Sequence, residues 1–351
     1  MTLAGEHPQL TIGGIEIAAG TRQTINLSVA DLTIGTPVHL PVIVHRGNRP
    51  GPVMFLSAAM HGDEINSVEI VRRVLKLPVL AELAGTLLAV PVVNVLAFLH
   101  QSRYLPDRRD LNRSFPGSET GSLAARLAHL FLKEVVGKAD FGIDLHTGAL
   151  HRPNLPQIRS DLSSPDNKRL AKAFGAPLFL DSKPAEGTLR AYTTAQGIPA
   201  ILYEACEALR FDETAIRIGV QGVVNVMMEL EMLPRAGDAP VSSVEPIYAK
   251  SEGWARAPVS GILRSQVALG DAVKKGQTLG LIGTPFDDRE EAVIAPFGGI
   301  IIGRVTLPLI YEGEAAFHIA RVETPDAVEK QVDQIEAESA EWDGHAEPRI
   351  V

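Results

Sequence analysis

Apolar and polar positions follow three different spacings along this chain. Up to about residue 45 they alternate, as in "HLPVIVH", which predicts short antiparallel strands. From residue 46 to about 235, apolar runs typical of buried strands alternate with segments whose apolar positions recur at helical spacing. This alternation predicts a layered α/β domain, in which ligands bind beyond the carboxyl ends of the strands.

The elements of this α/β region can be named from the pattern. The predicted strands are "PVMFLSAAM", "GTLLAVPVV", "ADFGIDLH" and "IPAILYEA". The predicted helices are "SVEIVRRVLKL", "SLAARLAHLFLKEVV", "NKRLAKAFG", "GTLRAYTTAQG" and "ETAIRIGVQGVVNVMMELEML". We expect residues 1–45 to be a β segment packed on a catalytic domain that spans residues 46–235.

The rest of the chain has a different pattern. "PRAGDAP", at residues 234–240, is a linker by composition. Residues 243–323 contain short β segments separated by glycines, in two similar halves, and predict a small β-sandwich. Residues 324–351 are polar and acidic, and we expect them to form a tail outside both domains.

Length and composition narrow the class of protein. The 351 residues are enough for two domains, and 45% hydrophobic with 21% charged residues describe an ordinary globular chain. The net charge of −9 argues against nucleic acid or an anionic membrane as the main partner, but is compatible with a local basic pocket. The single cysteine, Cys206, excludes a disulfide framework. We see neither a signal peptide nor a membrane span, and therefore expect a cytoplasmic protein.

Polar residues stand where three of the predicted strands end. His61 and Glu64 follow the first strand, His146 ends the third, and Glu204 lies in the fourth. In a layered α/β fold these ends share one edge, so the four side chains can converge. Two histidines and a glutamate form a donor set that binds catalytic zinc and leaves one position for water. Taken singly, each residue also fits a polar turn or a structural histidine, and Asp144 either orients a ligand or faces the other side of its strand.

Four motifs, "HGDE", "DLNRSFPG", "DLHTG" and "YEACE", resemble in order and spacing those of the succinylglutamate desuccinylase/aspartoacylase family, relatives of the zinc carboxypeptidases. The resemblance covers roughly residues 50–325. It implies a zinc-carboxypeptidase-like layered α/β domain that holds one Zn²⁺ per chain through His61, Glu64 and His146. It also makes Glu204 the catalytic carboxylate, which would take a proton from the attacking water and pass it to the leaving amine.

The resemblance further assigns substrate-binding residues. Asn112 and Arg113 of "DLNR" match the family's clamp for a substrate carboxylate, which a guanidinium can bind through two hydrogen bonds. Arg103 of "SRY" resembles the arginine that polarises the scissile carbonyl. Two extra residues between these motifs leave Arg108 and Arg109 as alternatives for that role.

Two other positions depart from the family pattern. Cys206 stands where a glycine is usual, two positions after the catalytic glutamate. A further substrate-binding arginine of the family has only Arg190 as a loose counterpart. These departures bear on the choice of substrate more than on the metal or the reaction type.

The C-terminal segment "PVSGILRSQVALGDAVKKGQTLGLIG" resembles the biotinyl/lipoyl-like barrel-sandwich hybrid. A carrier module of that kind needs a lysine on the hairpin between its two halves. That hairpin is "TPFDDREE", and no lysine occurs from Gly276 through Glu329. We therefore expect the module to shape the mouth of the active site or an oligomer contact.

Together these observations predict a zinc-dependent amidohydrolase that removes an N-acyl group from a small amino acid or related carboxylate. One alternative is a zinc carboxypeptidase acting on peptides, which would need an open groove. The other is a non-catalytic binding protein with a vestigial site, which the presence of Glu204 beside all three ligands disfavours. The sequence leaves open the acyl group, the amine and whether the chain forms a homo-oligomer.

Overall fold

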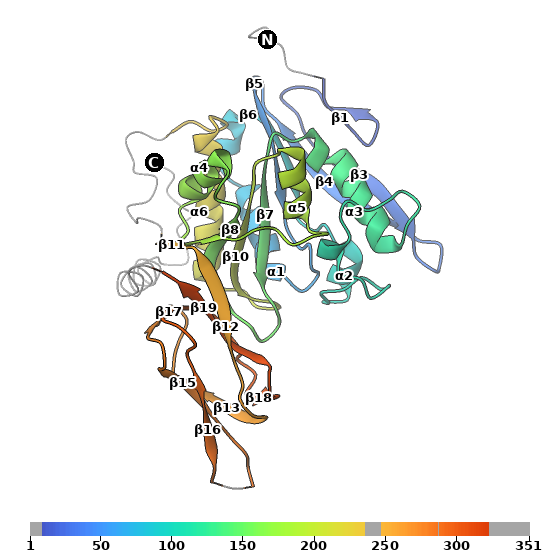
Figure 1. Cartoon of the computed structure of the whole chain (residues 1–351). Coiled ribbons are helices and arrows are strands. Elements are labelled where there is room, and N and C mark those ends of the chain that lie inside the picture. Colours follow the sequence, from blue (N-terminus) through green and yellow to red (C-terminus); the bar gives the residue numbers. More distant parts are fainter. Residues whose placement is uncertain (1–8, 236–246, 287, 323–351) are drawn as a thin grey trace.

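The computed structural model describes residues 9–235, 247–286 and 288–322 (Figure 1). The predicted tail at residues 324–351 and the predicted linker beyond residue 235 lie outside these ranges. The described chain forms a larger α/β unit and a smaller unit of strands, which lies below it in Figure 1. Within the described ranges, no helix is both long and apolar enough to cross a membrane.

A mixed sheet runs through the larger unit, in the order β3-β4-β6-β5-β7-β10-β8, with β9 paired to the outer edge of β8. β5, β6, β7 and β10 are parallel, as the βα alternation predicts, whereas β4 and β8 run antiparallel to β6 and β10. The strands of this unit are β1 (Thr11–Ile12), β2 (Ile15–Glu16), β3 (Arg22–Asp31), β4 (Pro37–Arg46), β5 (Arg49–Ser57), β6 (Ala84–Val90), β7 (Phe141–Gly148), β8 (Asn154–Ser160), β9 (Leu178–Asp181) and β10 (Ala200–Glu207).

Helices cover both faces of this sheet, which confirms the layered α/β prediction. Successive residues of β5 point to opposite faces, so Met54 and Leu56 belong to the core under α1, α4 and α6, whereas Phe55 belongs to the core under α2, α3 and α5. The helices are α1 (Ile65–Val74), α2 (Val95–Leu99), α3 (Leu123–Glu134), α4 (Pro165–Phe174), α5 (Leu189–Gln196) and α6 (Glu213–Glu229), with short 3₁₀ turns at Pro78–Glu82, Leu111–Arg113 and Val136–Lys138.

The N-terminal strands extend this sheet at its edge. β3 and β4 form an antiparallel hairpin, and β4 pairs with β6 from Ile43 to Arg46. The domain boundary that the sequence predicts after residue 45 thus falls at the end of β4.

The smaller unit, called the C-terminal module below, consists of residues 247–322 as far as they are described. One sheet contains β16, β15, β13 and β18, and the other contains β12, β19, β17 and β14. Leu279 and Phe317 are fully buried in the core that these sheets share. The strands are β11 (Ile247–Ala249), β12 (Ser251–Arg256), β13 (Gly261–Ser265), β14 (Ala272–Val273), β15 (Thr278–Gly283), β16 (Glu290–Ile294), β17 (Gly299–Arg304), β18 (Leu309–Ile310) and β19 (Ala315–Arg321).

The C-terminal module is docked on the larger unit through both backbone and side chains. β11 pairs in parallel with β9, and β17 meets β8 where Gly303 pairs with Asn154. A separate apolar cluster, called the docking cluster below, lies at this contact; it comprises Leu155, Leu178, Leu180, Ala249, Ile300, Ile302 and Ala320. The module is therefore held beside the strand that neighbours β10.

Candidate metal centre and surrounding cavity

The four polar residues at the predicted strand ends lie at one edge of the sheet. Glu204 of β10 is the register partner of His146 in the parallel strand β7. His61 and Glu64 lie in the turn that leads from β5 to α1. β5 pairs with β7 on the side away from β10. All four side chains line one cavity, as the shared edge of parallel strands predicts.

His61, Glu64 and His146 form a compact, buried group. Nδ1 of His61 lies 2.6 Å from Oε1 of Glu64, and Nδ1 of His146 lies 2.8 Å from Oε2 of the same carboxylate. One donor atom from each residue lies within 4.8 Å of the other two. Two imidazoles and one carboxylate at this spacing could hold a metal ion.

The turn that carries His61 and Glu64 depends on Gly62. A Cβ at Gly62 would lie 2.0 Å from the carbonyl carbon of Ala97 and 2.2 Å from the nitrogen of Phe98, because the backbone of α2 passes close by. Any side chain at this position would therefore displace the turn. Glu64 occupies the N-cap position of α1, where the helix dipole favours a negative charge.

Two further carboxylates hold the outer nitrogens of the histidines. Oδ2 of Asp144 is 2.8 Å from Nε2 of His146, and Oδ1 of Asp110 is 3.1 Å from Nε2 of His61. Ser57 donates a hydrogen bond of 2.7 Å to Asp144. Asp144 therefore faces the same side of β7 as His146, and both histidines are oriented as carboxylates commonly orient metal-binding imidazoles.

The electrostatics of this group favour a cation at its centre. Burial would raise the pKa of Glu64, but His61 and His146 outweigh it and hold that pKa well below its usual range. Burial would lower the pKa of His146, but Asp144 and Glu64 raise it well above 6.5, and Glu64 and Asp110 likewise raise the pKa of His61. The three carboxylates therefore stabilise positive charge on the two histidines, and a divalent cation could take the place of the protons that these histidines hold.

The cavity beside this group measures about 500 Å³, which is in the range of small-molecule sites. Its charged lining consists of six cationic side chains and three carboxylates: Arg103, Arg113, Arg152, Arg159, Lys183 and Arg190, with Glu64, Glu204 and Glu252. On a chain of net charge −9 this is a local basic site, and it suits an anionic ligand.

Of the three arginines predicted for carbonyl polarisation, Arg103 lines the cavity, whereas Arg108 and Arg109 are exposed on the same loop. Arg103 donates to Oδ2 of Asp110 through Nε at 3.1 Å and Nη2 at 2.8 Å. Because Asp110 also contacts His61, one carboxylate links the arginine to the metal group.

Asn112 and Arg113 lie in a 3₁₀ turn against the start of α5. Oδ1 of Asn112 accepts a hydrogen bond of 2.9 Å from the backbone N–H of Leu189, which fixes the turn on that helix. Arg113 is exposed, donates to the Asn112 carbonyl at 2.6 Å, and lines the cavity together with Asn112. The predicted carboxylate clamp is thus placed at the cavity rim.

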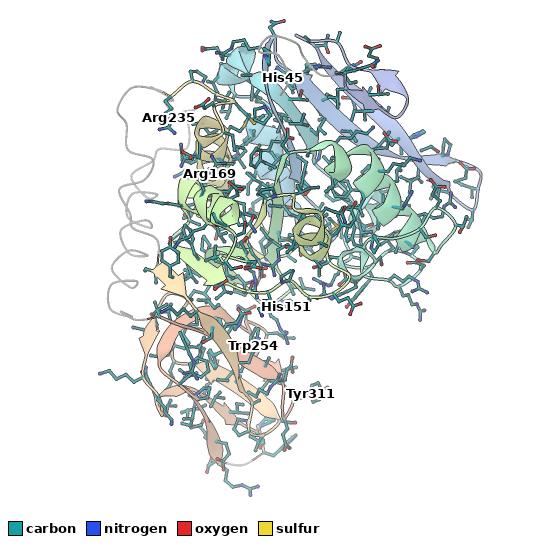
Figure 2. All side chains as sticks on the ribbon, turned by 45° about the horizontal axis from the view of Figure 1, so that its top comes forward. His45, His151, Arg169, Arg235, Trp254 and Tyr311 are labelled. Carbon is teal, nitrogen blue, oxygen red and sulfur yellow. The ribbon has the colours of Figure 1, made fainter. Side chains whose placement is uncertain are left out.

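A second part of the cavity wall is formed by β8, β10 and the C-terminal module. Asn154 of β8 donates a hydrogen bond to Oε1 of Glu204. Trp254 and His318 of the module stack with ring centroids 4.2 Å apart and an interplanar angle of 7°. Figure 2 labels Trp254 where the two units meet, near His151. Glu252, from the same strand as Trp254, also lines the cavity.

The two residues that depart from the family pattern have different surroundings. Arg190 lines the cavity and donates to the hydroxyl of Ser182 at 3.2 Å. Burial, and then the charge of Arg159, lowers the pKa of Arg190 to about 10, so it is still cationic at neutral pH. Cys206 has a φ of 55°, a left-handed conformation that costs about 1–2 kcal/mol without glycine. Burial raises the pKa of its thiol well above its usual range, so Cys206 stays protonated.

Sequence reasoning did not assign a role to Asp110, which contacts His61, or to several residues that line the cavity. Asp110 opens the motif "DLNR", so its position two residues before Asn112 was a usable signal. The others carry no local signal, because packing between β8 and the module brings them to the cavity; they are Asn154, Arg159, Glu252, Trp254 and His318.

Comparison with known proteins identifies the family of this chain. Residues 50–230, just over half of the chain, match the succinylglutamate desuccinylase/aspartoacylase catalytic domain family. The N-α-acetyl-L-2,4-diaminobutyric acid deacetylase of Halomonas elongata is 28% identical over 254 residues, which cover 69% of this chain and 73% of that protein.

Solved structures show the same fold. The product-bound ectoine utilization protein of Ruegeria pomeroyi superposes with a TM-score of 0.77 at 22% identity, covering 86% of this chain and 94% of that one. A succinylglutamate desuccinylase/aspartoacylase from Rhodobacter sphaeroides gives the same TM-score and identity, covering 86% and 95%.

Proposed function

The chain belongs to the succinylglutamate desuccinylase/aspartoacylase family, and on that premise we propose that it is a zinc-dependent amidohydrolase. Its reaction removes an N-acyl group from a small amino acid or related carboxylate. The observation that carries this proposal is the convergence of His61, Glu64 and His146 with Glu204 in one cation-lined cavity. The deacetylase activity named for the Halomonas relative supports chemistry at an N-acyl amide bond.

In this proposal, His61, Glu64 and His146 hold one zinc ion per chain. When bound, zinc supplies a Lewis acid that polarises the amide carbonyl and acidifies the attacking water. Asp110 and Asp144 keep both histidines oriented, as their contacts with the outer nitrogens support.

The remaining steps use side chains of the cavity. Glu204 takes a proton from the attacking water and returns it to the nitrogen of the departing amine. The guanidinium of Arg103 stabilises the negative charge that develops on the carbonyl oxygen. Asn112 and Arg113 bind the free carboxylate of the amino-acid part, for which a planar guanidinium is well suited.

The cavity favours a small substrate over a peptide. A carboxypeptidase needs a groove that continues past the metal, whereas Glu252, Trp254 and His318 of the C-terminal module add to the lining of this cavity. A binding protein without catalysis would have no use for a carboxylate such as Glu204 in register with a metal ligand.

A turnover screen tests the proposal. Zinc-loaded protein is given N-acetyl amino acids with acidic, neutral and cationic side chains, including N-α-acetyl-2,4-diaminobutyrate, the substrate named for the Halomonas relative. Dipeptides of the same amino acids, blocked at the amino end and free at the carboxyl end, are measured in parallel. We expect release of the free amine from at least one N-acetyl amino acid, dependence on zinc, and slower cleavage of every blocked dipeptide. Preferred cleavage of the dipeptides supports the carboxypeptidase alternative, and binding without turnover supports the binding protein.

A further inference from the structure

Arg159 lies between two carboxylates that belong to different units. Its Nη2 atom is 2.7 Å from Oε1 of Glu252 in the C-terminal module. Its Nη1 atom is 4.0 Å from Oε1 of Glu204 in β10. The guanidinium therefore forms a short, hydrogen-bonded ion pair with the module, whereas its ion pair with the proposed catalytic carboxylate is long and lies outside hydrogen-bond distance.

Nothing in the local backbone prevents a direct pair between Arg159 and Glu204. The two residues lie on neighbouring antiparallel strands, where Arg159 pairs in register with Leu202 and Glu204 pairs with Gln157. They are thus diagonal neighbours on one face of the sheet, within reach of a long side chain. Both side chains are 19% exposed, so neither is fully solvated.

Glu252 lies against His318 of the module and is placed to hold Arg159. Its Oε2 atom lies 3.1 Å from Nε2 of His318, which in turn stacks on Trp254. Burial would raise the pKa of Glu252, but His318 and Arg159 outweigh it and lower that pKa, so the carboxylate is ionised at neutral pH.

We propose that Glu252 is a positioning residue of the active site, which holds Arg159 away from Glu204. Without Glu252, the guanidinium turns to Glu204 and forms a charge-assisted pair with its carboxylate. Such a pair adds a close positive charge to the hydrogen bond that Glu204 already accepts from Asn154, and it therefore weakens the tendency of the carboxylate to take a proton from the attacking water. The C-terminal module thereby keeps the base of the other unit free. This inference rests on the proposed function, in which Glu204 is the base.

A double-mutant cycle on the full-length zinc-loaded protein tests this role. We expect Glu252→Gln to lower kcat about tenfold, which corresponds to about 1.4 kcal/mol of activation free energy. In the Arg159→Met background the same substitution is expected to change kcat by less than about twofold, because no guanidinium is left to block Glu204. A merely structural role of the ion pair between Glu252 and Arg159 would instead make Arg159→Met alone lower kcat as much as Glu252→Gln does, whereas in the proposed role Arg159→Met alone should keep kcat within about twofold.

The chain offers a matched control in Glu314→Gln. Glu314 is another carboxylate of the module, and it pairs at 3.2 Å with Arg152, another arginine of the cavity lining. We expect this variant to keep kcat within about twofold. It frees Arg152, whereas the guanidinium that contacts Glu204 belongs to Arg159. Glu252→Asp is a second probe, which keeps a carboxylate at this position. It should give a smaller loss that also vanishes in the Arg159→Met background.

Zinc content and thermal midpoint are measured for every variant. The inference is overturned if Glu252→Gln keeps normal kcat, or if its loss is as large in the Arg159→Met background. If Glu204→Gln itself keeps normal turnover, the failure lies with the proposed function. If Glu204→Gln is inactive and the cycle shows no coupling, only the role of Glu252 falls.

Discussion

The two walls of the cavity are built by different means. The metal-side wall is built from two short motifs, in which His61 and Glu64 are three residues apart and Asp144 and His146 are two apart, and parallel strands bring these buried motifs together. The module-side wall is long-range, since Arg159 and Glu252 are 93 residues apart and the side chains are partly exposed. Local motifs thus define the chemistry, whereas packing between units sets the surroundings of that chemistry.

This difference also appears in the charge balance. At the metal-side wall three carboxylates surround two histidines, so this group stabilises positive charge, either as protons on the histidines or as a bound cation that replaces them. Along the whole cavity, cationic side chains outnumber carboxylates six to three. The charges at the metal-side wall therefore suit a metal cation, and those of the remaining cavity lining suit an anionic ligand. Substitutions in each region are expected to differ in kind as well as in size.

The largest effect is expected at the metal-side wall. His146→Ala and His61→Ala should each reduce bound metal from about one ion per chain to a small fraction, because three protein donors are the minimum for such a site. Metal analysis after dialysis measures this, and turnover should fall by more than about a hundredfold with it. His129→Ala, at a partly exposed position on α3, is the control and should keep its metal. Undiminished metal in both variants would remove these histidines from the assignment.

Glu204 joins the two walls, and its substitution should separate chemistry from metal binding. Glu204→Gln keeps a side chain of the same size that can accept a hydrogen bond but cannot take a proton. We expect kcat to fall at least about a hundredfold with normal zinc content. Steady-state kinetics with parallel metal analysis decides between the outcomes. Near-normal kcat on any hydrolysed substrate would mean that another group is the base.

Arg113 at the cavity rim should affect substrate choice more than chemistry. Truncating one partner of a charged pair typically costs about 2–5 kcal/mol, so Arg113→Ala should lower kcat/KM for N-acyl amino acids about thirtyfold or more. The same substrates with an amidated carboxylate should lose much less. Arg109 is an exposed arginine of the neighbouring loop, so Arg109→Ala is the control. It should leave kcat/KM unchanged for both the acid and the amidated substrates. Equal losses of Arg113→Ala on acid and amide would contradict the clamp.

The smallest expected effect concerns the pH dependence of thermal stability. A rising pH should destabilise the metal-free protein, whereas it should favour metal binding. The carboxylates raise the pKa values of His61 and His146 above 6.5, so metal-free folded protein binds these protons more tightly than the unfolded chain. That stabilisation is complete below pH 6.5 and is lost as the pH rises through the raised values. The affinity for the metal rises as the pH rises, because the histidines must lose these protons before they can bind it. The difference in thermal midpoint between zinc-loaded and chelator-treated protein should widen from pH 6 to pH 9, by at least a few degrees. A constant or narrowing difference would contradict a site formed by these histidines.

The sequence predicted the metal-side wall because its information is local. Apolar runs place β5, β7 and β10, and parallel strands must end together, so His61, His146 and Glu204 could be brought together before any coordinates. β8 was not predicted, since "NLPQIRS" contains a proline and no regular alternation. Without β8 the sequence offers no reason to bring Arg159 to the cavity. The contact between Glu252 and Arg159 depends on how two separately folded cores meet, which no short-range pattern encodes.

The docking cluster has a consequence for recombination between relatives. A crossover at the junction of the two units replaces Ile300 and Ile302 but keeps Leu155 and Leu178, which must then fit a foreign surface. The same exchange replaces Glu252, Trp254 and His318, so the chimera would inherit one parent's metal ligands and the other parent's cavity wall. In this chain the boundary between units and the wall of the candidate cavity coincide. Swapping the module is therefore an exchange of cavity residues, and we expect a functional chimera to need β8 and the module from the same parent.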